Sequence, residues 1–222
     1  KRQVSLSADL YHTFGKVQTN LLVEGFYTIL DDVFALRDMD DAADGGKVKE
    51  RYNGSGATVR GFNVEGRAAF TRWFELQAGV TLQQSRYKEP EFWSEDAEVP
   101  PVRRMFRTPD AYGYFTASFK PVRNFTADLS GTCTGSMLVQ HMAGSGVAQD
   151  VAVSTPSFFD MNIRLSYDVR IYKEITMQLY GGVQNLFNAY QKDFDKGVDR
   201  DSGYIYGPSL PRSWFVGAKF SF

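Results

Sequence analysis

The chain of 222 residues carries 25 basic and 26 acidic side chains, for a formal net charge of −1. That balance gives no electrostatic reason to expect nucleic acid or an acidic substrate as a partner. Because no run of about 18 apolar residues occurs, membrane-spanning helices are excluded. The single cysteine, Cys133, excludes an internal disulfide and a cysteine-based metal site.

Apolar and polar residues alternate in nine successive segments, which is the period of a β-strand. In the first segment, for example, Val4 and Leu6 alternate with Ser5 and Ser7. The predicted strands lie at about 4–11, 17–36, 57–71, 73–88, 110–120, 125–139, 159–170, 174–189 and 214–222.

The sixth segment is the most informative, because its alternation runs unbroken from Phe125 to Val139. A strand in a soluble protein usually spans about 5–6 residues, whereas a strand that crosses a membrane needs about 9–11. One side of this segment is apolar or small, and the other carries hydroxyl groups and Asp128. The pattern predicts a transmembrane β-barrel strand with lipid on one face and a hydrated lumen on the other.

The connections alternate in length along the chain. They are short near 15–16, 71–73, 121–124 and 170–173, and long and polar at 37–56, 89–109, 140–156 and 190–207. Outer-membrane barrels have short periplasmic turns and long extracellular loops. This rule places Phe222 at the periplasmic side and Lys1 at the outer side. Since bacterial single-chain barrels have an even number of strands, nine strands predict further sequence upstream.

Several motifs resemble the C-terminal barrel of TonB-dependent outer-membrane receptors. They are Asn185-Leu186-Phe187-Asn188 with Tyr190 close behind, the Pro211-Arg212 entry into the last strand, Arg107-Thr108-Pro109, and the terminal strand ending in Phe220 and Phe222. The resemblance covers the whole chain, 1–222.

The resemblance implies an all-β, antiparallel transmembrane barrel of roughly 22 strands, of which this chain holds about nine C-terminal ones. It also implies an N-terminal plug domain and a TonB box, neither of which is found in this chain. The implied function is TonB-dependent import of a large scarce chelate, which could be a ferric siderophore, haem or cobalamin, across the outer membrane of a Gram-negative bacterium. The alternatives are a passive porin and a surface adhesin barrel. A plug domain in the upstream sequence would distinguish a receptor from a porin.

The implied partners are outer-membrane lipid, the TonB complex through the missing N-terminal region, and the barrel assembly machinery. Phe220 and Phe222 match the C-terminal signal that the assembly machinery reads. The alternative interpretation of these two residues is a strand that merely ends in phenylalanine.

The loop at 87–107 is the expected chelate-contacting segment, because aromatic faces and guanidinium groups suit a bulky, planar or anionic ligand. Its candidate residues are Tyr87, Phe92, Trp93, Arg103, Arg104, Phe106 and Arg107. The alternative is that they belong to the outer aromatic girdle or pair with the glutamates of the same loop.

The last long loop contains four alternating carboxylates around Gly197, namely Asp193, Asp195, Asp199 and Asp201. Oxygen ligands around a glycine turn are able to bind calcium, but the closing glutamate of an EF-hand is missing. A solvated acidic loop is the alternative, and we expect the Asp38, Asp40, Asp41 and Asp44 cluster to be solvated as well.

No catalytic constellation is evident. The chain has two histidines, His12 and His141, and no nucleophile is spaced to work with either of them. We therefore expect neither an enzyme nor a bound cofactor.

Overall fold

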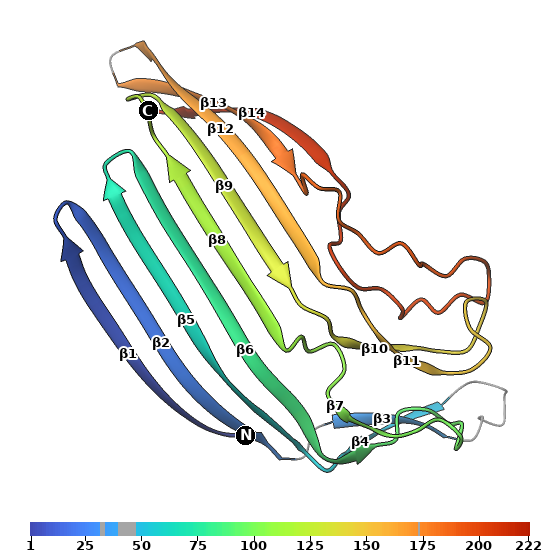
Figure 1. Cartoon of the computed structure of the whole chain (residues 1–222). Coiled ribbons are helices and arrows are strands. Elements are labelled where there is room, and N and C mark those ends of the chain that lie inside the picture. The colour runs from blue at the N-terminus through green and yellow to red at the C-terminus, as the bar shows by residue number, and fades with distance from the viewer. Residues whose placement is uncertain (32–33, 40–47, 173) are drawn as a thin grey trace.

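The computed structural model describes residues 1–31, 34–39, 48–172 and 174–222, which form strands and loops. None of these residues belongs to a helix long and apolar enough to cross a membrane. The main sheet has nine strands in chain order (Figure 1): β1 (Arg2–Phe14), β2 (Val17–Leu30), β5 (Ala57–Thr71), β6 (Phe74–Glu91), β8 (Ala111–Phe119), β9 (Phe125–Thr134), β12 (Phe158–Tyr172), β13 (Ile175–Gln184) and β14 (Ser213–Ser221).

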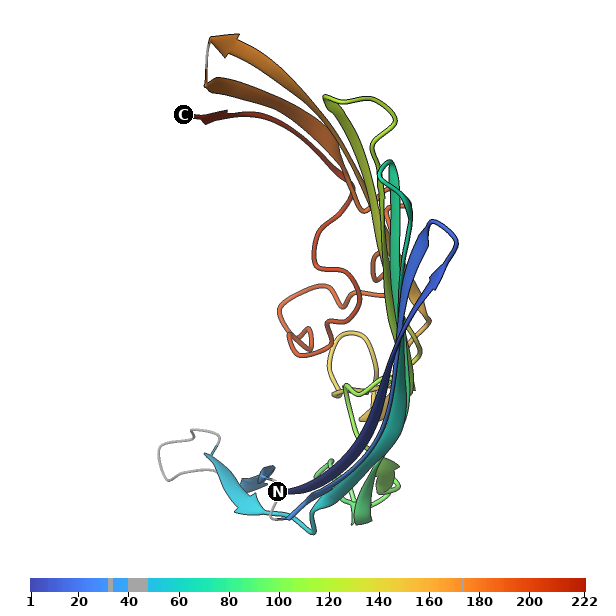
Figure 2. The same cartoon turned by 90° about the vertical axis from the view of Figure 1, so that its left-hand side faces the viewer.

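Each strand of the main sheet pairs antiparallel with the next along the chain. The predicted antiparallel all-β fold of about nine strands is therefore confirmed. The sheet is one curved layer (Figure 2), and it is not closed, since β1 and β14 stand at opposite ends of the strand order.

The short strand β7 (Val102–Arg104) is added to β6. Two small hairpins also lie in the long connections: β3 (Phe34–Met39) pairs with β4 (Val48–Asn53), and β10 (Leu138–His141) pairs with β11 (Val151–Ser154). Sequence periodicity did not reveal these three features, because each is too short for the alternation to stand out.

The short and long connections are sorted to opposite ends of the sheet (Figure 1). The C-terminus lies at the end with the short turns, and the N-terminus lies at the end with the long loops. The first turn, Gly15-Lys16, shows why a short connection suffices. Gly15 has φ +63° at the first central position of a two-residue turn, the geometry that matches the right-handed twist of the flanking strands.

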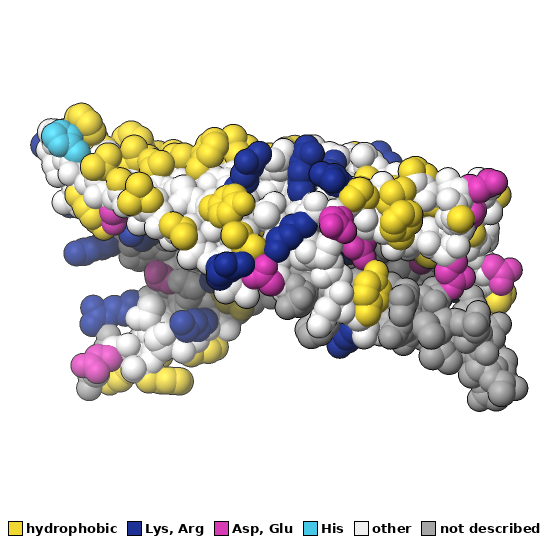
Figure 3. All heavy atoms as spheres, turned by 90° about the horizontal axis from the view of Figure 1, so that it is seen from below, with side chains coloured by type: hydrophobic (Ala, Val, Ile, Leu, Met, Phe, Trp, Pro, Cys, Tyr) yellow, Lys and Arg dark blue, Asp and Glu magenta, His cyan; other side chains and the backbone are white. Residues whose placement is uncertain are grey.

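The register gathers apolar side chains on one face of the sheet. Ala8, Val23, Val64 and Val80, for example, are direct neighbours across β1, β2, β5 and β6. Further along the sheet, apolar side chains of this face remain open, with Val216 89% exposed. Figure 3 views the sheet from the loop end, along its strands. Hydrophobic side chains gather along the upper side of that view, with basic side chains among them.

The apolar face is the convex one. The loop at 185–212 lies on the hollow side of the sheet (Figure 2), and there the backbone N–H of Asn185 donates to Asn162 Oδ1 at 2.9 Å. Asn162 belongs to the polar face of β12, since it alternates with Met161 and Ile163. The apolar side chains therefore point away from the hollow, where no second layer of described residues covers them.

The concave face is joined by hydrogen bonds between neighbouring strands. Asn63 Nδ2 donates to Glu24 at 2.9 Å, and Thr81 Oγ1 donates to Asn63 Oδ1 at 2.8 Å, so three strands are linked in one row. Farther along the sheet, Ser118 donates to Asp128 at 2.7 Å and Gln178 donates to Asp168 at 2.9 Å. The inward-facing carboxylates predicted from the alternation thus form part of a polar wall.

Three predicted strands, the second, the sixth and the eighth, end earlier in the structure than in the sequence pattern. The sixth ends at Thr134 instead of Val139, because the Gly135 N–H donates to Ala111 O at 2.8 Å and the chain then enters the β10–β11 hairpin. There Val139 pairs with Val153. The second predicted strand likewise ends at Leu30 instead of about residue 36.

The eighth strand ends at Gln184 because Asn185 turns the chain. Asn185 and Asn188 have φ of +49° and +53°, the left-handed conformation that asparagine tolerates better than most residues. The Asn185 side chain, 2% exposed, donates to Ala189 O and Leu210 O at 2.8 Å each and accepts from the Ala189 N–H at 2.8 Å. The Asn-Leu-Phe-Asn motif therefore joins the two ends of the 185–212 loop.

We expect Val64→Arg to impair insertion into a bilayer strongly. Its side chain lies in the middle of the convex face, where a charge costs about 2–4 kcal/mol at the bilayer midplane. Insertion into lipid vesicles, measured as the folded fraction against urea, checks this expectation. The control is Thr116→Arg, whose side chain lies on the concave face, and equal losses in the two variants would contradict the assignment of the faces.

We expect Asn185→Ala to loosen the 185–212 loop by about 2–4 kcal/mol, because three hydrogen bonds are lost and buried backbone groups are left unpaired. Hydrogen-exchange protection of residues 189–212 measures the effect. Asn185→Gly separates the causes, since glycine adopts the left-handed conformation freely but lacks the amide. Protection restored by glycine would show that backbone conformation, and not the side-chain hydrogen bonds, holds the loop.

Candidate functional site

The candidate site is the cluster of loops at the long-loop end, built mainly from residues 87–110, 135–157 and 185–212. Two of the predicted aromatic residues pack on each other there: the Trp93 and Phe106 rings meet edge to face with centroids 5.4 Å apart. Trp93 Nε1 also donates to Pro100 O at 3.3 Å. Tyr87 lies on β6, directly opposite Ala57 of β5, and is half-buried.

Two of the predicted ligand-contacting arginines connect loops to one another. Arg104 donates from Nη2 to Ser136 O at 2.7 Å and forms an ion pair with Asp110 at 3.0 Å. Arg107 donates from Nη1 to Ile205 O at 2.9 Å, and its Nη2 donates to Gly203 O. These guanidinium groups are occupied by loop contacts, so their role in the structure is to position the loops.

Arg107 is also held by its backbone. Its φ is +54°, and its N–H donates to Leu138 O at 2.7 Å. Neighbouring Phe106 forms a bridge with the same residue, Leu138. The segment that enters β8 is thus tied both to the β10–β11 hairpin and to the 185–212 loop.

Among the seven predicted residues, Phe92, Arg103 and Arg107 are exposed, and the guanidinium of Arg107 is already used in the loop contacts above. Phe92 is 71% exposed, and Arg103 is an exposed residue in the short strand β7. They supply an aromatic face and a cation, the two features that motivated the prediction.

A buried pair that spacing did not indicate lies between two of the loops. His141 Nε2 lies 2.9 and 3.0 Å from the two carboxylate oxygens of Asp195, and the side chains are 8% and 4% exposed. The His141 ring stacks on Tyr204 with centroids 3.7 Å apart and planes 4° apart. A side chain at Gly146 would collide with the Asp195 carboxylate, which shows how closely the 142–147 segment covers it.

The hydrogen bond from His141 holds the pKa of Asp195 below its ordinary range. Asp195 is therefore ionised at neutral pH and accepts from the imidazole. Because Tyr204 covers the ring and little of either side chain is exposed, this pair fastens the loops together and leaves little surface for a substrate to approach.

Two tyrosines share the neighbouring carboxylate. The hydroxyl groups of Tyr204 and Tyr206 donate to Asp193 at 2.6 and 2.5 Å. Burial and the Asp193 carboxylate raise the pKa of Tyr204, and the same causes raise that of Tyr206 to about 12. Burial acts to raise the pKa of Asp193, but its hydrogen bonds, chiefly those from the two phenols, together outweigh burial and leave the pKa lowered. At neutral pH the tyrosines are protonated donors and Asp193 is a charged acceptor.

The same tyrosines form the small hydrophobic core of the loop cluster. Val139 and Phe158 pack with Tyr204 and Tyr206, which are 3% and 7% exposed. Gln191, 1% exposed, donates to Tyr204 O at 3.1 Å and accepts from the Tyr206 N–H at 2.9 Å. The 185–212 loop is therefore a packed structure with its own core. The alternation of Tyr204 and Tyr206 before Gly207-Pro208 was the sequence signal for it.

The four predicted calcium ligands are not brought together as a metal site. Asp193 accepts from two tyrosines and Asp195 from His141, while Asp201 accepts from the Met142 N–H at 2.8 Å and the Gly203 N–H at 2.7 Å. Asp199 contributes its backbone carbonyl to the Ser145 N–H. Within the described ranges, no group of three or more His, Cys, Asp or Glu side chains has an arrangement that would hold a metal ion.

The second acidic cluster lies mostly outside the described residues, which is where Asp40, Asp41 and Asp44 fall. On the concave face, two cavities of about 220 and 240 Å³ lie beside Pro208, and Asp160 lines both. Each is smaller than the roughly 300–1,000 Å³ of typical ligand pockets. Neither of these two cavities is large enough to enclose a bulky ligand.

No protein-family model matches this sequence, and no curated protein matches it. Solved structures do match in fold. The ferric-catecholate import receptor Fiu from *E. coli* K12 superposes with a TM-score of 0.60 at 18% identity, covering 98% of this chain and 27% of Fiu. The copper transporter OprC gives 0.61 at 14%, covering 99% of this chain and 31% of OprC.

The ferripyoverdine receptor of the outer membrane of *Pseudomonas aeruginosa* gives a TM-score of 0.59 at 12% identity, covering 97% of this chain and 26% of the receptor. This chain thus spans less than a third of the length of each of these three proteins. At such identities the likeness concerns the fold alone. The chain has the fold of part of the β-barrel of an outer-membrane import receptor.

Proposed function

We propose that this chain is part of the barrel wall of an outer-membrane receptor that imports a large, scarce metal chelate in a TonB-dependent manner. The observation that carries the proposal is the single curved sheet with an uncovered apolar convex face and a hydrogen-bonded polar concave face. Such a sheet suits hydrocarbon on one side and a hydrated lumen on the other.

The proposed orientation places the short turns and Phe222 in the periplasm and the long loops outside the cell of a Gram-negative bacterium. In this orientation the described long loops, which pack around their own small core, lie at the outer end of the lumen. In this proposal they receive the chelate, and coupling to the TonB complex requires a plug and a TonB box from sequence upstream of this chain.

A ferric siderophore is the preferred cargo, with haem and cobalamin as further members of the same class. Two of the similar structures are described by their names as a ferric-catecholate and a ferripyoverdine receptor, and a third as a copper transporter. Exposed Phe92 and Arg103 are the proposed contacts, because an aromatic face and a guanidinium suit an aromatic or anionic chelate.

We expect the full-length protein to bind a ferric siderophore with micromolar affinity or better. Replacing both contacts, in Phe92→Ala/Arg103→Gln, is expected to weaken binding about tenfold, the loss of one charge-assisted contact and one stacking contact. Fluorescence titration with ferric catecholate and ferric hydroxamate siderophores, haem and cobalamin measures the affinities.

The matched control is Arg123→Gln, which removes a charge at the short-turn end and is expected to bind like the unaltered protein. Absence of binding to every chelate, together with passive solute flux in liposomes, would support the porin alternative. Unchanged affinity in the double variant would remove Phe92 and Arg103 from the proposed site.

We also propose that the end of β14 is the signal read by the barrel assembly machinery. Phe220 and Phe222 lie on the apolar face with Trp214 and Val216, and Phe222 is 95% exposed. An exposed terminal aromatic side chain is available for recognition before insertion.

Deletion of Phe222 is expected to lower the amount of protein inserted into the outer membrane several-fold. Quantitative immunoblotting of outer-membrane fractions measures the effect, with Lys219→Gln on the opposite face of β14 as the control. Equal insertion of the deletion variant and the unaltered protein would refute the signal.

A further inference from the structure

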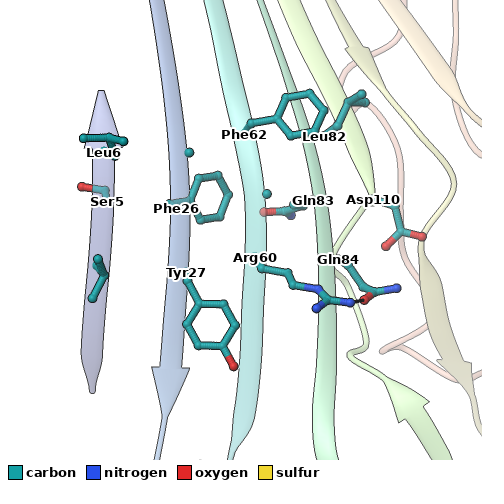
Figure 4. A pocket seen from close by; sticks show the side chains of 13 residues that line it. Ser5, Leu6, Phe26, Tyr27, Arg60, Phe62, Leu82, Gln83, Gln84 and Asp110 are labelled. Atoms are coloured by element: carbon teal, nitrogen blue, oxygen red, sulfur yellow. Dashed lines mark hydrogen bonds between the residues drawn. The ribbon is translucent and has the colours of Figure 1, made fainter. Parts of the chain in front are cut away.

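A groove of about 770 Å³ crosses β1, β2, β5 and β6 on the convex face (Figure 4). Its floor is the backbone of one row of paired residues, which includes Ser5, Phe26 and Gly61. The side chains of this row point to the concave face. Its two walls are the neighbouring rows of convex-face side chains. Leu6, Phe62 and Leu82 form one wall, and Tyr27, Arg60 and Gln84 form the other.

The groove is an open, shallow one, and one position of its wall has no side chain. Gly25 stands between Leu6 and Phe62 in register, and a Cβ placed on it would meet no atom within 4 Å. Four strands spaced about 4.8 Å apart make the groove roughly 14 Å long. This length and the apolar wall suit an acyl chain better than a globular partner.

The loop-side wall of the groove is basic. Arg60 Nη2 donates to Gln84 Oε1 at 2.8 Å, and Arg86 follows Gln84 on the same face of β6. In the part of the chain that the structure describes, neither arginine has a carboxylate partner. Two guanidinium groups at the edge of an apolar groove therefore lack a counter-charge.

Two carboxylates near this edge are already paired. Asp31 binds both Arg2 and Lys88, at 3.3 and 2.8 Å, and Asp110 binds Arg104 at 3.0 Å. The five basic side chains Arg2, Arg60, Arg86, Lys88 and Arg104 outnumber Asp31 and Asp110 by three on this face, and Glu89 and Glu91 occupy the alternate positions at the end of β6. That surplus is complementary to a phosphate group.

The arginines lie at the depth where lipid headgroups begin. On the same strand as Arg60, β5, Phe70 stands beside the short turn at 71–73. The ten residue-to-residue steps from Arg60 to Phe70 rise about 34 Å along the strand. With a strand tilt of about 35–45°, this is roughly 26 Å along the membrane normal, close to the ~25 Å apolar band of such barrels.

We propose that this groove binds one phosphate-bearing lipid of the outer leaflet. An acyl chain lies across Gly25 between the two walls, and Arg60 and Arg86 bind the phosphate. Because the strands tilt, a groove perpendicular to them slants from the headgroup level into the apolar band, which is the path of a lipid chain. The inference rests on the proposed membrane location.

The test uses the full-length protein extracted from outer membranes in a mild detergent and titrated with diphosphoryl lipid A in native mass spectrometry. Arg60→Gln/Arg86→Gln, which removes the phosphate partners, is expected to weaken binding about tenfold. Gly25→Leu, which fills the groove and leaves both arginines in place, is expected to weaken it to a similar degree. Arg72→Gln/Arg123→Gln, which removes two charges at the short-turn end, is expected to bind like the unaltered protein.

Two further probes separate the sources of phosphate. Phosphate-free lipid A is expected to bind the unaltered protein weakly, with about the affinity of diphosphoryl lipid A for the arginine variant. Inorganic phosphate is not expected to compete with diphosphoryl lipid A for the unaltered protein. Equal lipid binding by the unaltered protein, Gly25→Leu and the arginine variant would overturn the groove. Recovery of the unaltered protein outside the membrane fraction would instead refute the membrane location on which the inference rests.

Discussion

The register between neighbouring strands is the constraint on which the rest of this structure depends. Side chains alternate between the two faces, so a slip of one residue would turn a whole strand's apolar set toward the hollow and its polar set toward the outside. The pairing of β1 with β2 and of β2 with β5 runs without a shift over the full recorded length. Two register shifts, between Ala69 and Thr71 and between Arg170 and Tyr172, stand next to short turns, and a third, between Arg86 and Glu91, lies where β7 joins β6.

A wall of this kind also satisfies its own backbone. Each interior strand pairs on both sides, so its peptide groups need no water, which is what a hydrocarbon surrounding requires. The concave face adds a second set of bonds, in which amides and hydroxyl groups such as Asn63 and Ser118 donate to carboxylates of the next strand. Charges on the inner side are thereby neutralised or solvated, while the outer side remains apolar.

The loop cluster is stabilised differently from the sheet, because it has its own hydrophobic core. Tyr204, Tyr206, Phe158 and Val139 exclude water. Arg104 and Arg107, together with the His141–Asp195 pair, connect segments that are far apart in the chain. The result is a mouth whose loops hold each other in place, with a few open side chains such as Phe92 left at its surface.

Sequence reasoning succeeded where the physics is periodic. Nine strands, their two faces and the sorting of the connections could all be predicted, because alternation depends only on neighbouring residues. It failed where partners come from distant loops: nothing near His141 points to Asp195, 54 residues away. The aspartate run around Gly197 resembled a calcium loop because the pattern of carboxylates is local, whereas their hydrogen-bond partners, Tyr204 and Met142 among them, are decided by how the loops pack.

The two ends of the 185–212 loop meet at one asparagine, because Asn185 binds both Ala189 and Leu210. The segment is therefore closed at its base, while Arg107 and the His141–Asp195 pair hold its far part against the neighbouring loops. The entropy cost of closing such a segment grows only slowly with its length. Exposed residues between the two contacts could therefore be exchanged or inserted while β13 and β14 keep their register.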